Sequence, residues 1–204
     1  MRITEITLCL LILTSSAHAG QCKKFINEDN WTTVCQQVAN QHIAQYAGIY
    51  NFEIITGIQL AVETISSIYG QLDPFTMFQL CEWAIATAEQ ESFFRFAVGS
   101  AGEIGPYQFK LNTVRLVGKI YTLDVGTTDR EIVENLLDNT MATYIFSLHF
   151  YNLLHRHKTL WRAWRSYNNG KHATQYANEI MHRYTRINAL TQKYCHTQLT
   201  LAAK

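Results

Sequence analysis

One stretch of the chain has almost no polar face, and it limits the folds that the whole chain can adopt. Asp73 followed by Pro74 is a helix start signal, with the aspartate as N-cap and the proline at the first helical position. The helix is expected to extend to about residue 94, and its apolar residues include Met77, Phe78, Leu80, Cys81, Trp83, Ala84, Ile85, Ala86 and Ala88. A helix that is apolar on all sides must be surrounded by other elements. We therefore expect a central helix with several others packed around it.

The rest of the chain also favours helix over strand. Proline occurs only at positions 74 and 106, and long stretches separate the turn signals. Thr128 and Glu131 have the spacing of a capping box, which predicts the start of another long helix. The further expected helices cover residues 54–69, 128–155, 161–167 and 173–184. The predicted fold class is all-α.

Size and charge restrict the number of domains and the kinds of partner. The chain has 204 residues, 48% of them hydrophobic, which suffices for one compact domain with its own core. The chain has seventeen Lys and Arg and sixteen Asp and Glu, so its formal net charge is +1. It has no basic run. Nucleic acid is therefore not expected as a partner.

The N-terminus has the pattern of a secretory signal. Arg2 precedes the apolar residues 8–13, and the small-x-small triplet Ala17-His18-Ala19 predicts cleavage near Ala19. The alternative, an N-terminal membrane anchor, would need about 20 apolar residues, and this stretch is much shorter. The sequence predicts an exported protein whose mature chain, residues 20–204, has no transmembrane segment.

Four cysteines remain after removal of the signal, in a compartment that permits oxidation. They are Cys22, Cys35, Cys81 and Cys195, and they allow three disulfide pairings, none of which the sequence favours. Buried free thiols are the alternative. Since no CxxC pair is present, and His155 and His157 point away from each other on a helix, no metal site is expected.

Glu91 is the candidate catalytic residue. With about 100 degrees of rotation per residue, Glu91 continues the stripe formed by Met77 and Cys81, whereas Glu82 and Glu89 lie on the opposite side of the helix. Apolar neighbours should raise the pKa of the Glu91 carboxyl towards neutrality, which suits a proton donor. In the alternative interpretation the helix frays after residue 88 and Glu91 is solvated.

Three motifs in one order carry a family resemblance. They are Ala88-Glu89-Gln90-Glu91-Ser92-Phe93-Phe94, then Gly102-x-x-Gly105-x-x-Gln108 with Thr113 behind it, and finally Tyr167-Asn168 opening a turn after a small apolar helix. Together they resemble the signatures of the soluble lytic transglycosylases, relatives of goose-type lysozyme. The resemblance spans residues 73–184 or so.

The resemblance implies a lysozyme-like helical domain with a sugar groove and no cofactor. Its substrate would be peptidoglycan glycan strands, cleaved between N-acetylmuramic acid and N-acetylglucosamine to leave a 1,6-anhydro end. Glu91 would act alone as acid and then base, with the hydroxyl of Tyr167 pointing towards it. The implied substrate-binding residues are Ser92, Tyr107, Gln108, Tyr144, Tyr167 and Asn168. Together with the signal at 1–19 that the N-terminal pattern predicts, the expected organisation is an N-terminal helical extension at 20–72, the catalytic domain at 73–190 and a tail at 191–204.

Departures from the family pattern keep other interpretations open. Glu103 stands where the family has a small residue, either as a second catalytic group that would permit hydrolysis or as a solvated loop side chain. Tyr144 belongs to a poorly kept signature. The alternatives are a hydrolytic muramidase and a catalytically silent wall-binding component of a secretion or conjugation machine. A small exported transglycosylase would act in the periplasm, with proteins of such a machine as possible partners.

Overall fold

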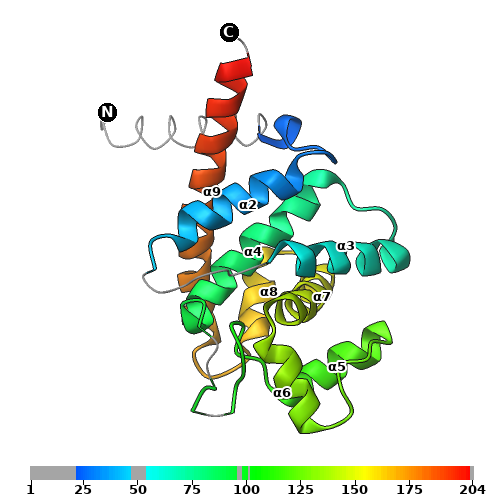
Figure 1. Cartoon of the computed structure of the whole chain (residues 1–204). Coiled ribbons are helices and arrows are strands. Elements are labelled where there is room, and N and C mark those ends of the chain that lie inside the picture. The colour runs from blue at the N-terminus through cyan, green and yellow to red at the C-terminus, as the bar shows by residue number, and fades with distance from the viewer. Residues whose placement is uncertain (1–21, 47–53, 96–97, 101, 203–204) are drawn as a thin grey trace.

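The chain is all-α, as predicted. The computed structural model describes residues 22–46, 54–95, 98–100 and 102–202, and within these ranges it has helices and no β-strand. The expected signal and its cleavage site lie outside the described residues. The helices are α2 Trp31–Ile43, α3 Ile55–Tyr69, α4 Pro74–Ser92, α5 Leu111–Tyr121, α6 Asp129–Leu137, α7 Asn139–His157, α8 Leu160–Tyr167 and α9 Ala173–Ala202 (Figure 1).

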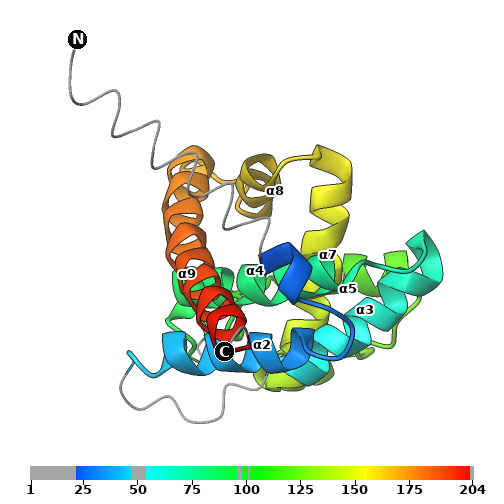
Figure 2. The same ribbon diagram turned by 90° about the horizontal axis from the view of Figure 1, so that it is seen from above.

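Helix α4 is the central helix that its sequence predicts. Asp73 caps it by accepting a hydrogen bond from the backbone N–H of Thr76 at 3.2 Å, and Pro74 occupies the first turn. Helices α2, α3, α7 and α9 all contact α4, and Figure 2 shows them around it. Residues 77–89 of α4 are buried, with the exception of half-buried Gln79. Packing on every side explains why this segment has no polar face.

Two helix boundaries differ from the prediction. The single helix expected over residues 128–155 is two helices, because Asp138 has extended backbone (ψ 127°) and caps α7 through a 2.8 Å bond from Met141 N–H. The predicted capping box at Thr128 and Glu131 is confirmed at the start of α6. Helix α9 continues far beyond residue 184, because Ile187, Thr191 and Cys195 extend its buried face. The tail expected at 191–204 is therefore helical as far as Ala202.

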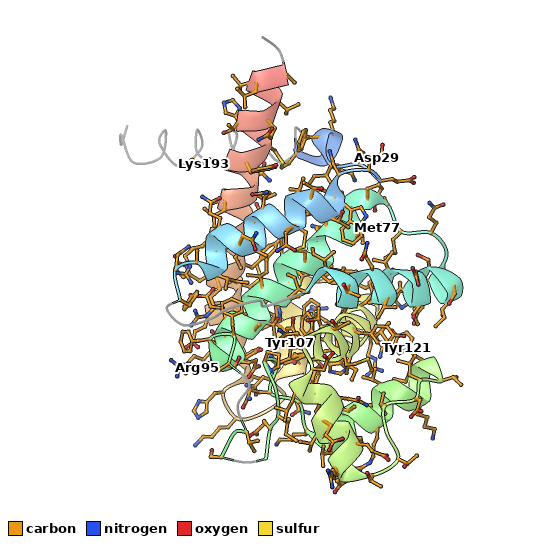
Figure 3. The ribbon with its side chains drawn as sticks, in the orientation of Figure 1. Asp29, Met77, Arg95, Tyr107, Tyr121 and Lys193 are labelled. Atoms are coloured by element: carbon orange, nitrogen blue, oxygen red, sulfur yellow. A yellow bond between two sulfur atoms is a disulfide. The ribbon has the colours of Figure 1, made fainter. Side chains whose placement is uncertain are left out.

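The segment before Asp73 shares the core of the rest of the chain. Helix α3 packs along α7, and α2 packs against α4 and α9. Val34, Ile58 and Ile65 belong to the same hydrophobic cluster as Phe78 and Trp164. The expected N-terminal extension at 20–72 is thus integrated into the packing that supports α4. Figure 3 shows how densely side chains fill the space between these helices.

Two disulfides fix the pairing that the sequence left open. Cys35 of α2 is bonded to Cys81 of α4, and Cys22 is bonded to Cys195 near the end of α9. The second bond closes a sequence separation of 173 residues and joins the first described residue to the last helix. The prediction of structural disulfides is confirmed. No helix in the described ranges is both long and apolar enough to cross a membrane.

Two glutamates of α4 are more deeply buried than the expected catalytic one. Glu89 is 1% exposed and accepts hydrogen bonds from His42, Tyr46 and Arg183, in addition to one from Arg186. Burial acts to raise its pKa, but these hydrogen bonds and positive charges outweigh burial and hold the pKa at about 2. Glu89 is therefore an ionised link between α2, α4 and α9.

Glu82 is the opposite case. It is fully buried, and its partners include the hydroxyl of Thr191, at 2.7 Å, and the side-chain amide of Asn188. Burial raises the pKa of Glu82 to about 7, and the hydrogen bonds only reduce that rise. At neutral pH this core carboxyl lies close to its titration point.

We expect the burial of Glu82 to lower the free energy of unfolding as pH rises. Because its folded pKa of about 7 exceeds its ordinary value of 4.5, its contribution is complete below pH 4.5 and is lost as pH rises through 7. Between pH 5 and 8 the wild type should lose on the order of 3 kcal/mol more unfolding free energy than Glu82→Gln. Urea unfolding of both proteins at four pH values measures this, and parallel pH curves would contradict it.

Candidate functional site

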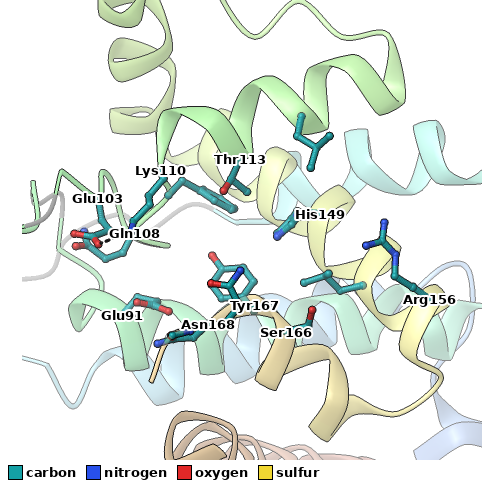
Figure 4. Close-up of a pocket in the computed structure, with 15 residues that line it drawn as sticks. Glu91, Glu103, Gln108, Lys110, Thr113, His149, Arg156, Ser166, Tyr167 and Asn168 are labelled. Carbon is teal, nitrogen blue, oxygen red and sulfur yellow. Dashed lines mark hydrogen bonds and ion pairs between the residues drawn. The ribbon is translucent and has the colours of Figure 1, made fainter. Parts of the chain in front are cut away.

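One cleft of about 510 Å³ contains most of the predicted site residues. Its walls come from the end of α4, the turn that follows it, α5, α7, α8 and the loop after α8 (Figure 4). The side chains that line it are Glu91, Glu103, Gln108, Phe109, Lys110, Thr113, Leu116, His149, Leu153, Arg156, Ser166, Tyr167, Asn168 and Asn169, with Gly170 at the edge.

Glu91 lies in the last turn of α4, with its carboxyl at the cleft. Helix α4 continues through Ser92, so the helix does not fray before Glu91. The hydroxyl of Tyr176 in α9 donates a 2.6 Å hydrogen bond to Glu91 Oε1. Burial raises the pKa of Glu91 to about 7, the Tyr176 hydrogen bond opposes this, and the negative charge of Glu103 adds to it. The predicted rise of the Glu91 pKa is therefore confirmed.

The effect of the Tyr176 hydrogen bond can be measured as a change in the pKa of the Glu91 carboxyl. Because the phenol stabilises the charged form of Glu91, Tyr176→Phe should raise the pKa of Glu91 above its value of about 7, by less than about one unit. Carbon-detected NMR titration of the Glu carboxyl signals gives the pKa of Glu91 in the wild type and in Tyr176→Phe. The Glu91 signal is assigned by its absence in Glu91→Gln. Phe keeps the ring in its packing position, so an unchanged or lower pKa would contradict the assigned hydrogen bond.

Glu103 lies across the cleft from Glu91. Its side chain is 25% exposed, and its carboxylate lies 3.7 Å from the ammonium of Lys110. Figure 4 shows Glu103, Gln108 and Lys110 together on the wall that faces Glu91. Glu103 is thus a half-buried wall residue and not a solvated loop side chain.

The turn between residues 98 and 110 has a fixed geometry. Ile104 and Phe109 exchange two backbone hydrogen bonds of 2.9 Å, which close the turn around Gly105. Gly105 has φ 77°, and a Cβ there would collide with the backbone carbonyl of Leu136, so only glycine fits. Gln108, at φ 48°, donates from Nε2 to the Gly105 carbonyl at 2.8 Å. The turn therefore presents Gln108 to the cleft in one orientation.

Tyr167 and Asn168 reach the cleft from the end of α8, and the hydroxyl of Tyr167, which was expected to point towards Glu91, has its hydrogen bond elsewhere. The Tyr167 hydroxyl donates to the backbone carbonyl of Tyr107 at 2.8 Å. Its ring stacks against Tyr176 with the centroids 6.4 Å apart. The hydroxyl that reaches Glu91 comes from Tyr176 instead, 85 residues away in sequence, which no local pattern indicates.

Three predicted substrate contacts do not line this cleft. Tyr107 is fully buried, stacked on Phe146 and bonded to Thr143. Tyr144 shares a 2.9 Å hydrogen bond with Thr64 of α3. The Ser92 hydroxyl donates to the Pro106 carbonyl at 2.9 Å and ties α4 to the turn. Because Tyr107 is fully buried, its expected role as a sugar ligand is corrected to a structural one, whereas the expected roles of the half-buried Ser92 and Tyr144 stay predictions.

Three cleft residues from α7 were not predicted: His149, Leu153 and Arg156. His149 packs against the rings of Phe109 and Tyr167, and Arg156 lines the end of the cleft remote from Glu91. Burial, with a smaller effect of the Arg156 charge, lowers the pKa of His149 to about 4, so this imidazole is neutral at physiological pH. Their sequence context, a helix dominated by core residues, gave no signal.

The cleft combines a carboxyl whose pKa is raised to about 7, amide side chains and aromatic walls. No group of three or more His, Cys, Asp or Glu within the described part of the chain is placed to hold a metal ion. No family model, no curated protein and no solved structure matches the chain. A carboxyl with a pKa near neutrality is chemically able to give a proton to a polar ligand and to take one from it.

Proposed function

We propose that the protein is a peptidoglycan lytic transglycosylase that uses Glu91 as its general acid and base. The observation that carries the proposal is the half-buried Glu91 carboxyl, with its pKa raised to about 7, on the wall of an open cleft beside Gln108 and Asn168. The order of the three motifs in the sequence supports the same function. The helical core around α4 is compatible with the lysozyme-like domain that the motifs imply.

The reaction needs one group that first gives and then takes a proton. Protonated Glu91 donates to the glycosidic oxygen, the C1–O bond breaks, and N-acetylglucosamine leaves as an alcohol. The Glu91 carboxylate then accepts the proton of the muramic acid C6 hydroxyl, whose oxygen bonds to C1. The ring closes, Glu91 is protonated again, and no water is consumed.

The neighbours of Glu91 support these two steps. Tyr176 holds one carboxyl oxygen at 2.6 Å, which leaves the other for the substrate. Gln108 and Asn168 offer amide groups that match the N-acetyl groups of the sugars. The half-buried aromatic ring of Tyr167 in the same walls suits the apolar face of a sugar ring.

Hydrolysis is the second candidate, and Glu103 is the observation that favours it. A glycosidase that uses water needs a second carboxylate near the scissile bond. Glu103 faces Glu91 across the cleft, although its carboxylate is paired with Lys110. A muramidase would use the same substrate and leave reducing ends.

Export is part of the proposal. The N-terminal pattern of residues 1–19 and the two disulfides are what an exported protein would have. We place the activity in the periplasm, where glycan strands are accessible. Proteins of a secretion or conjugation machine that must pass through the wall are the proposed partners.

Incubation of residues 20–204 with purified sacculi tests the proposal. We expect soluble muropeptides to be released, and the release to fall above pH 7 as Glu91 loses its proton. Protein that sediments with the sacculi but releases nothing would contradict the enzymatic function and favour a silent wall-binding component.

A further inference from the structure

A second hollow adjoins the cleft and has a different character. Its volume is about 510 Å³, and it shares Ser166, Asn169 and Gly170 with the walls of the cleft. The rest of its lining comes from the exposed side of α8 and from the flanking ends of α7 and α9. We call this hollow, lined by His157, Trp161, Arg162 and Arg165 in addition to the shared residues, the basic pocket.

The arrangement of α8 separates a packing face from a binding face. Ala163 and Trp164 are completely buried, and the Trp164 indole N–H donates to Thr87 of α4 at 3.2 Å. Arg162 and Arg165 are three residues apart, so both lie on the same exposed side of the helix. The Arg165 guanidinium lies 5.9 Å from the centre of the Trp161 ring, which limits the positions it can take.

The positive charges of the basic pocket have no acidic counterpart in the described chain. None of the ion pairs among the described residues includes Arg162 or Arg165. The Nε2 atom of His157, which also lines the pocket, is buried and has no hydrogen-bond partner among the described residues. Arg156, at the end of the cleft remote from Glu91, also forms no ion pair with a described residue. A carboxylate ligand would satisfy these groups, because guanidinium groups bind carboxylates through paired hydrogen bonds.

We propose that the basic pocket binds the carboxylates of the stem peptide attached to a muramic acid residue in the cleft. This inference rests on the proposed function, since the glycan strand places its peptide beside the cleft. The stem peptide is the acidic branch of the substrate, and the pocket opens next to the wall that the glycan would contact. The protein therefore prefers strands that carry peptides over stripped strands.

Binding measured without turnover tests this preference. In Glu91→Gln protein, dissociation constants are measured at physiological ionic strength for peptide-bearing strands and for the same strands stripped by an amidase. We expect about tenfold tighter binding of the peptide-bearing strands, the size of two charge-assisted hydrogen bonds in a partly exposed pocket. The added change Arg162→Gln/Arg165→Gln should reduce this ratio to near one, whereas the control Arg130→Gln, on exposed α6, should leave it at about tenfold.

The outcomes separate this inference from the proposed function. Equal affinity for the two kinds of strand, or a preference that survives Arg162→Gln/Arg165→Gln, would overturn the peptide pocket. Both arginines are exposed, so their replacement leaves the buried face of α8 intact, and circular dichroism verifies the fold. A different result would count against the proposed function and not against the peptide pocket. In that result Glu91→Gln protein binds peptide-bearing strands but does not bind stripped strands.

Discussion

Glu91→Gln is expected to lower the release of muropeptides from sacculi by about 10³- to 10⁴-fold, the range over which a positioned acid or base contributes. Glutamine can still accept the Tyr176 hydrogen bond, but it can neither donate the proton to the leaving oxygen nor take one from the C6 hydroxyl. The substitution removes a carboxyl that is costly to bury, so the unfolding temperature should stay the same or rise.

Glu103→Gln is the matched comparison for Glu91→Gln. It removes the other carboxylate of the cleft and its ion pair with Lys110. In a transglycosylase it should change the rate by less than about tenfold and lower the pKa of Glu91, because its charge raises that pKa. A loss as large as that of Glu91→Gln would identify Glu103 as a second catalytic group and favour hydrolysis. Glu134→Gln, on exposed α6, controls for the loss of a charge.

Loss of the Cys22–Cys195 disulfide should have the largest effect on stability. The bond closes a loop of 173 residues, and in the chain-entropy account a loop of this size contributes about 5 kcal/mol. Cys22→Ser/Cys195→Ser should therefore destabilise the protein by up to about that amount. Cys35→Ser/Cys81→Ser, which opens a loop of 46 residues, should cost about 1 kcal/mol less.

Urea unfolding under non-reducing conditions measures both variants against the wild type. If a serine variant does not accumulate, wild-type protein in which one or both bonds have been reduced and alkylated provides the same comparison. A smaller loss for the Cys22–Cys195 pair than for the Cys35–Cys81 pair would contradict the expected order. It would indicate that linking Cys22 to α9 restricts the unfolded chain less than the loop length suggests.

Local signals in the sequence predicted the parts of the fold that depend on them. The Asp73-Pro74 start, the apolar surface of α4 and the Thr128–Glu131 capping box are read from neighbouring residues, and each is present. The break at Asp138 was not predicted, because its capping of α7 interrupts a pattern that remains compatible with one helix. The full length of α9 depends on contacts with Cys22 and Glu82, which are distant in sequence.

The difference between local signals and contacts distant in sequence also explains which residues of the site were predicted. Glu91, Gln108, Tyr167 and Asn168 were predicted from short motifs, and all four line one cleft. Tyr176 was missed because only folding brings α9 to Glu91. Tyr107 and Tyr144 were assigned to the sugar from motif position alone, whereas their burial and partners depend on the packing of α7.

The burial of Glu82 and Glu89 shows a limit of helical periodicity. Helical periodicity separated Glu91 from the other two glutamates, but it did not show which residues cover the side of α4 that carries Glu82 and Glu89. Helix α2, the turn after it and helix α9 cover that side. They supply His42, Tyr46 and Arg183 to Glu89, and Thr191 to Glu82. In a helix with no exposed face, the role of a polar residue depends on the residues that pack against it, and the sequence of the helix does not identify these.

The most direct test of the proposed chemistry is digestion of sacculi in water enriched in oxygen-18, followed by mass spectrometry of the released muropeptides. A transglycosylase with Glu91 as its only acid and base should give 1,6-anhydro products that lack one water and contain no heavy oxygen from the cleavage. Reducing-end products with one oxygen-18 at C1 of muramic acid would contradict this account, because they would show that water attacks the sugar.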